Sequence, residues 1–155
     1  MNHFRVLPVP AAIAREVRSS LRSPQYGHPA VATLATGYGP CRSCLRPFEQ
    51  GVDHRILFTY NPFDGLDRYP EPGPIFVHRE ECEAHRAEGF PPGLRGLPLT
   101  LEAFAEARWM VRREHLDGRD PEPLLAAMLE IPEVRYVHLR NTEAGCFIAR
   151  VEREP

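Results

Sequence analysis

Two pairs of potential metal ligands, far apart in the chain, limit how this sequence can fold. Cys41 and Cys44 form a C-x2-C motif in the stretch GPCRSCLRPF, and His78 and Cys82 form an H-x3-C motif. A C-x2-C turn places two sulfurs within reach of one ion, and residues four apart share one face of a helical turn. A site built from both pairs requires the loop around Cys41 to meet the segment around His78.

The chemistry of these four side chains favours zinc. Thiolates and imidazole are borderline-soft donors that suit zinc better than magnesium or calcium. We therefore predict zinc as cofactor, with Cys41, Cys44, His78 and Cys82 as its ligands. Four protein ligands leave no open position for water, which is typical of a structural rather than a catalytic site.

Cys146 is an alternative ligand. It could replace His78 and complete a site of four cysteines. It also begins a β-rich run in which it shares a face with Ile148 and Arg150, and this pattern favours the interpretation of Cys146 as a core residue.

Redox chemistry is the alternative use of the cysteine pair. C-x2-C thiols can cycle between dithiol and disulfide, and Arg42 and Arg46 could stabilise a thiolate. Such pairs usually begin a helix after a strand, whereas Pro47 discourages a helix here. The sequence predicts a zinc-stabilised binding module, with a thiol-redox or zinc-dependent enzyme that uses Cys41 and Cys44 as the alternative.

Length and charge limit the class of protein. The 155 residues predict one domain over residues 1–155. The N-terminal stretch MNHFRVLPVP lacks the apolar run of a secretory signal, and no segment is apolar enough to cross a membrane, so we expect a cytoplasmic protein. All 19 basic residues are arginine, which excludes lysine chemistry. The net charge of −2 argues against nucleic acid and leaves a small molecule or a protein as partner.

The apolar patterns predict an α+β fold, with a mostly antiparallel sheet and about two helices. Helices are expected from Pro10 to Ser23 and over residues 121–131; strands are expected over residues 4–9, 31–36, 55–60, 74–78, 134–140 and 146–152. The five residues NTEAG between the last two strands suit a hairpin turn. In residues 97–111 every odd position is apolar, which favours a strand, bent or paired as a hairpin, although the residue types favour a helix.

Several stretches together resemble an uncharacterised bacterial family, domain of unknown function 1203. They are FRVLPVPAAIAREVR, YGHPAVATLATGYGPCRSCLRPF, FTYNPFDGLDRYPEPGPIFVHREEC and YVHLRNTEAGCFIARVER. The resemblance implies a small single-domain bacterial protein. It implies no activity, substrate or catalytic residue.

Overall fold

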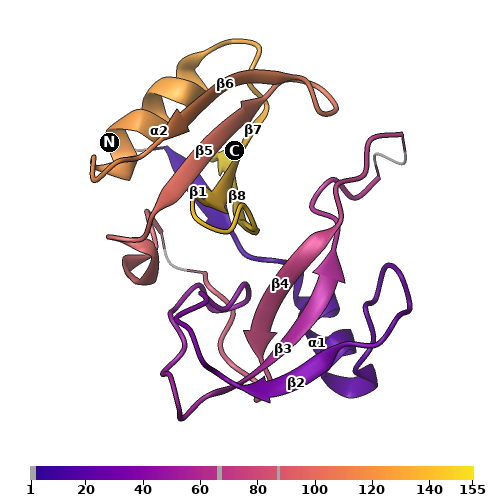
Figure 1. Cartoon of the computed structure of the whole chain (residues 1–155). Coiled ribbons are helices and arrows are strands. Elements are labelled where there is room, and N and C mark those ends of the chain that lie inside the picture. The colour runs from indigo at the N-terminus through magenta and orange to yellow at the C-terminus, as the bar shows by residue number, and fades with distance from the viewer. Residues whose placement is uncertain (1–2, 66–67, 87) are drawn as a thin grey trace.

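The computed structural model describes residues 3–65, 68–86 and 88–155, which form two antiparallel sheets, each accompanied by one helix (Figure 1). The larger sheet has the strand order β1-β8-β7-β5-β6, with β1 (Phe4–Leu7), β5 (Leu99–Phe104), β6 (Met110–His115), β7 (Tyr136–Asn141) and β8 (Phe147–Arg153). The smaller sheet has the order β2-β3-β4, with β2 (Val31–Leu34), β3 (His54–Tyr60) and β4 (Gly73–His78).

The two helices are α1 (Ala11–Ser20) and α2 (Pro121–Glu130), and a short 3-10 helix, η1, spans Pro92–Leu94. The predicted α+β fold, with antiparallel strands and about two helices, is confirmed, although the strands form two sheets where one was expected. No helix in the described part of the chain has the length and apolar character needed to span a membrane. The prediction of one domain over residues 1–155 stays a prediction.

Both helices begin where the sequence predicts. Pro10 precedes the first residue of α1, and Asp120 caps α2 by accepting a hydrogen bond from the Glu122 N–H at 3.2 Å. Helix α1 ends earlier than expected, because Leu21 adopts a left-handed conformation (φ 51°) while its N–H still bonds to the Val17 carbonyl. Leu21 therefore leaves the apolar stripe of the helix.

Residues 97–111 form a hairpin rather than one bent strand. Strands β5 and β6 pair antiparallel around a turn in which Ala107 has a positive φ of 59°, and the register shifts between Ala103 and Phe104. This shift breaks the alternation that the sequence suggests. Strand β5 lies between β7 and β6 and all its residues are buried, whereas Trp109 in the turn and Val111 on the edge strand β6 are exposed.

The turn between β7 and β8 forms as predicted for NTEAG. Gly145 has a positive φ of 76°, which a glycine adopts without strain. The Asn141 side-chain oxygen accepts hydrogen bonds from the N–H groups of Glu143 and Ala144, at 2.9 and 3.0 Å.

Each sheet has its own apolar core. Helix α2 packs Leu125 and Met128 against the five-stranded sheet. Helix α1 packs Val17 against the three-stranded sheet, in a core that also contains Cys41 and Cys44. The cysteine pair is therefore part of the second core and contacts the side chains that hold the smaller sheet to its helix.

His138 on β7 is fully buried among four aromatic rings. Its ring centroid lies 4.8 Å from that of Phe63, 5.3 Å from Phe104, 5.1 Å from Tyr136 and 4.9 Å from Phe147. Neither ring nitrogen has a hydrogen-bond partner among the described residues. Burial lowers the pKa of His138 well below 6.5, because a charged imidazolium is poorly solvated there.

This burial predicts that His138 makes the fold sensitive to acid. Below about pH 6.5 His138 becomes protonated in the unfolded chain but stays neutral in the folded protein. The free energy of unfolding therefore decreases as the pH falls. Between pH 7 and pH 5, wild type should lose up to about 2 kcal/mol more unfolding free energy than His138→Leu. Urea denaturation at both pH values measures the difference, with the exposed His28 replaced (His28→Gln) as control. Equal losses in wild type and His138→Leu would contradict the prediction.

Candidate metal centre

The first ligand pair lies in a tight turn held by backbone hydrogen bonds. The Cys41 N–H donates to the Arg46 carbonyl at 3.0 Å, and the Leu45 N–H donates to the Cys41 carbonyl at 2.9 Å. Leu45 has a positive φ of 58°, which turns the chain directly after Cys44. Both cysteines are buried, with 0% and 4% of their surface exposed.

The second pair comes from the end of β4 and the loop that follows. His78 is the last residue of the strand, where it pairs with Arg55 of β3. Cys82 lies in a segment without helical structure, so the helical spacing considered for this H-x3-C pair is not what brings its donors together. The loop turns back instead, and the His78 N–H donates to Cys41 Sγ at 3.3 Å.

All four predicted ligands meet at one place. One donor atom from each of Cys41, Cys44, His78 and Cys82 lies within 4.8 Å of every other. The Cys41 and Cys82 sulfurs are 3.9 Å apart, and Cys44 Sγ is 3.5 Å from His78 Nδ1. Around a tetrahedral zinc ion two sulfur ligands are about 3.8 Å apart, and a sulfur and a nitrogen about 3.6 Å. The observed separations fit such an ion.

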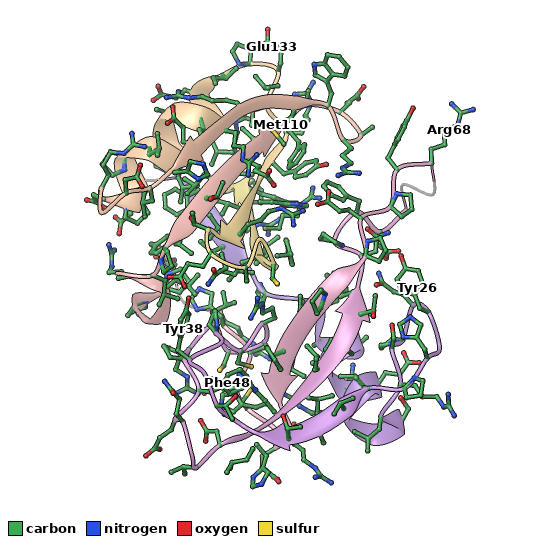
Figure 2. The ribbon with its side chains drawn as sticks, viewed as in Figure 1. Tyr26, Tyr38, Phe48, Arg68, Met110 and Glu133 are labelled. Atoms are coloured by element: carbon green, nitrogen blue, oxygen red, sulfur yellow. The ribbon has the colours of Figure 1, made fainter. Side chains whose placement is uncertain are left out.

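His78 is oriented by groups that the sequence did not point to. Its Nε2 lies 3.2 Å from Asp53 Oδ2, which leaves Nδ1 facing the sulfurs. A histidine whose second nitrogen bonds to a carboxylate is typical of metal sites, because the carboxylate fixes the ring and its tautomer. Phe48, which is labelled in Figure 2, packs edge-on against the imidazole of His78, and the two ring centroids lie 4.6 Å apart.

Arg18 of α1 is a second contributor that sequence reasoning missed. Its Nη2 donates to Cys82 Sγ at 3.2 Å, and its Nε donates to the His78 carbonyl at 2.9 Å. A charged donor of this kind stabilises the thiolate form of a cysteine. Helix α1 is thereby attached to both members of the second ligand pair.

The protonation of the cluster follows from these contacts. Burial raises the pKa of the Cys41 thiol, whereas hydrogen bonds from Cys41 lower the pKa values of Cys44 and Cys82. The hydrogen bond with Cys44 raises the pKa of His78 to about 10. A cation that binds all four donors must displace the protons of Cys41 and His78, so its affinity decreases as the pH falls.

Cys146 does not join this group. Its thiol lies by the turn before β8, 3.8 Å from the Ala144 carbonyl oxygen, and it is not among the donors that converge on Cys41. No helix follows Cys44, since residues 45–53 contain only turns and irregular backbone. The redox interpretation therefore lacks the helix N-terminus that usually activates such a pair.

The contact between Asp53 and His78 leads to a prediction about zinc affinity. Asp53→Asn preserves a side-chain oxygen for the Glu49 N–H, now bonded at 2.7 Å, but removes the charge that orients the imidazole. We expect zinc to bind at least about tenfold more weakly. Competition with a chromogenic chelator measures this affinity, and the exposed Asp117 (Asp117→Asn) provides the control. Unchanged affinity in Asp53→Asn would show that Asp53 has no role in orienting His78.

A family model described as "Protein of unknown function (DUF1203)" matches residues 38–153. The matched region contains all four members of the cluster and Asp53, and Arg18 lies outside it. Comparison with curated proteins and with solved structures finds no match for the chain.

Proposed function

Since this chain belongs to the DUF1203 family, whose description names no activity, we propose its function from the metal centre itself. We infer a zinc-stabilised binding module in which Cys41, Cys44, His78 and Cys82 hold a structural zinc ion. The observation that carries the proposal is the pair of separations, 3.9 Å between two sulfurs and 3.5 Å between sulfur and nitrogen, which both match a tetrahedral zinc ion.

The structural role rests on the number and burial of the donors. Four protein donors fill a tetrahedral ion and leave no place for the water that catalytic zinc needs. The ion would join three parts of the chain, namely the 41–46 turn, the end of β4 and the loop around Cys82. Because these parts are distant in sequence, zinc binding would contribute directly to the free energy of folding.

The binding role rests on a basic hollow beside the metal centre. A hollow of about 680 Å³ lies between α1 and the loop after β4, with Cys82 in its wall. Four arginines and two glutamates also line it, so positive charge prevails: Arg15, Arg18, Arg79, Arg86, Glu81 and Glu83. Guanidinium groups recognise carboxylates and phosphates in bidentate geometry. A small anion is therefore the ligand that best fits this hollow, and zinc would fix the loop that forms one of its walls.

Removal of zinc tests the structural role. The protein saturated with a hundredfold excess of zinc over its dissociation constant should melt about 5–10 °C higher than the chelator-treated protein. Elemental analysis should give one zinc per chain. Cys146→Ser should behave like wild type, whereas Cys82→Ser should lose the zinc-dependent increase.

A protein that carries no zinc and melts at the same temperature with and without it would refute the structural role. If Cys41 and Cys44 then formed a reversible disulfide, the thiol-redox alternative would replace it. The same thermal scans, run with and without a reductant, distinguish the two outcomes.

Charge-removing variants test the binding role. Titration calorimetry of the zinc-loaded protein with pyrophosphate should show saturable binding, weakened about tenfold in the double variant Arg15→Gln, Arg86→Gln. Both side chains are exposed, so the fold should tolerate the changes. Arg135→Gln, which removes an exposed arginine outside the hollow, should bind like wild type. Absence of saturable binding, or an equal loss in Arg135→Gln, would exclude this hollow as an anion site.

A further inference from the structure

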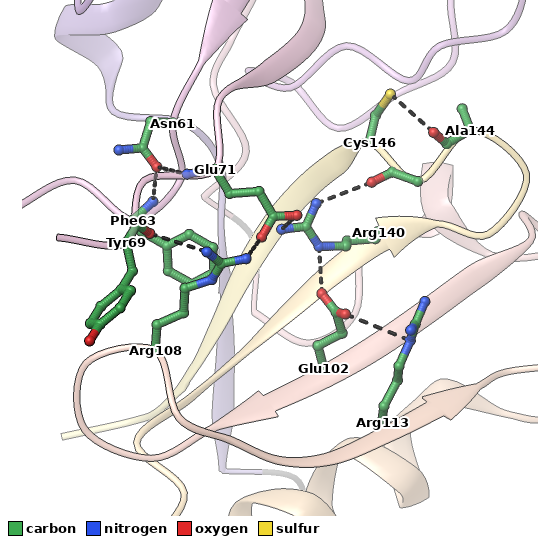
Figure 3. Close-up of polar contacts among 11 residues, drawn as sticks. Asn61, Phe63, Tyr69, Glu71, Glu102, Arg108, Arg113, Arg140, Ala144 and Cys146 are labelled. Atoms are coloured by element: carbon green, nitrogen blue, oxygen red, sulfur yellow. Dashed lines mark hydrogen bonds and ion pairs between the residues drawn. The ribbon is translucent and has the colours of Figure 1, made fainter. Parts of the chain in front are cut away.

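Cys146 lies between two hollows at the junction of the sheets, apart from the metal centre. One hollow, of about 280 Å³, also has Arg42 and Asn141 in its wall. The other, of about 220 Å³, has Arg140 and Glu71 in its wall. Figure 3 shows the thiol at the β7–β8 turn above the guanidinium of Arg140. The half-buried thiol is thus open to small molecules from two sides.

Arg42 is a buried cation without a carboxylate partner in the described part of the chain. Only 3% of its surface is exposed. Its Nε donates to the Phe147 carbonyl at 2.8 Å and its Nη1 to the Pro40 carbonyl at 2.6 Å. A buried charge that is hydrogen-bonded only to neutral groups lacks the compensation that an anion would give.

Burial lowers the pKa of Arg42 to about 10. Three nearby side chains that are neutral when protonated oppose this shift, namely Cys146, Cys41 and Tyr38. Cys41 belongs to the metal centre, and the hydroxyl of Tyr38 accepts a hydrogen bond from Asn141 at 2.6 Å. Of the three, only Cys146 lies in the wall of the same hollow as Arg42, and its thiol donates a weak hydrogen bond to the Ala144 carbonyl at 3.8 Å.

The rest of this hollow is mainly apolar. Leu57, Pro74 and Phe76 line it together with Ala144. In the second hollow two carboxylates balance the positive charge of Arg140. Its Nε bonds to Glu102 Oε1 at 2.5 Å, and its Nη2 lies 3.4 Å from Glu71 Oε1. On the Arg140 side an incoming anion would therefore meet the Glu71 carboxylate (Figure 3). On the Arg42 side no acidic residue lines the hollow.

We propose that Cys146 is a modification site, at which a small anionic disulfide forms a mixed disulfide with the thiol while its carboxylate binds beside Arg42. The buried guanidinium supplies the positive charge, and the apolar wall accommodates the short carbon chain. The site is independent of zinc binding, since Cys146 is no member of the metal centre.

The chemistry is thiol–disulfide exchange. The Cys146 thiol gives its proton to solvent, and the thiolate attacks one sulfur of the small disulfide. One S–S bond forms to Cys146 as the S–S bond of the reagent breaks, and the departing thiolate takes up a proton. The incoming disulfide is the only oxidant required, and a small thiol in excess reverses the reaction.

The test compares three small disulfides that differ in charge. Dithiodiglycolate is anionic, bis(2-hydroxyethyl) disulfide is neutral and cystamine is cationic. Each reacts with the full-length, zinc-loaded protein, and modification is followed by mass spectrometry on the tryptic peptide 141–150, in which Cys146 is the one cysteine. Each rate is divided by the rate for the free synthetic peptide NTEAGCFIAR, which has the same local sequence but no Arg42.

At low salt, the normalised rate should be about tenfold higher for the anionic than for the neutral reagent, and lowest for the cationic one. The preference should weaken at about 1 M salt, where the screening length falls to about 3 Å. Arg42→Gln should abolish it, and Arg113→Gln, on the exposed edge strand, should retain it.

Equal normalised rates for the three reagents, a preference for the cationic one, or no modification of peptide 141–150 would overturn the proposal. These outcomes are read from wild-type protein and so do not depend on whether Arg42→Gln folds. They are also separate from the zinc experiments, because a protein without zinc could still show the charge preference at Cys146.

Discussion

The convergence of three thiols and one imidazole is the constraint on which the rest of this structure depends. Buried sulfurs less than 5 Å apart cannot all ionise without a compensating charge. Protons compensate them in part, as the raised pKa values of Cys41 and His78 indicate. A divalent cation would do so more completely and at the same position. The turn at residues 41–46 and the end of β4 therefore meet at a place where a cation is favourable.

Arg42 connects this centre with the rest of the molecule. Its N–H donates to the Phe76 carbonyl on β4 at 2.9 Å, and its carbonyl accepts from Val9 at 3.0 Å. Its side chain reaches the Phe147 carbonyl on β8. One residue between the two cysteines thus joins the smaller sheet to the larger one, and places a buried positive charge between the cysteine–histidine cluster and Cys146.

The sequence predicted the site more completely than its surroundings. The four residues of the cysteine–histidine cluster could be predicted, because the spacing within each pair is local and because cysteine is scarce in this chain. The contacts of Asp53 and Arg18 could not be predicted, because neither residue has a fixed spacing to the clustered cysteines and histidine. Asp53 directly precedes β3, and Arg18 lies on α1. Arginine and aspartate are also common on exposed surfaces, so their residue type carries little information about a specific contact.

In the fold, too, local features could be predicted from the sequence and long-range contacts could not. Sequence alone determined the two helices, the strands with clear apolar runs and the NTEAG turn, because propensity, capping and turn chemistry act over a few residues. Only the tertiary structure decided that residues 97–111 form a hairpin and that Trp109 is exposed, because strand pairing and register depend on distant β7. It also decided which donors meet: a spacing motif brings together two ligands at most, and the approach of two such pairs is fixed by the packing of the elements between them.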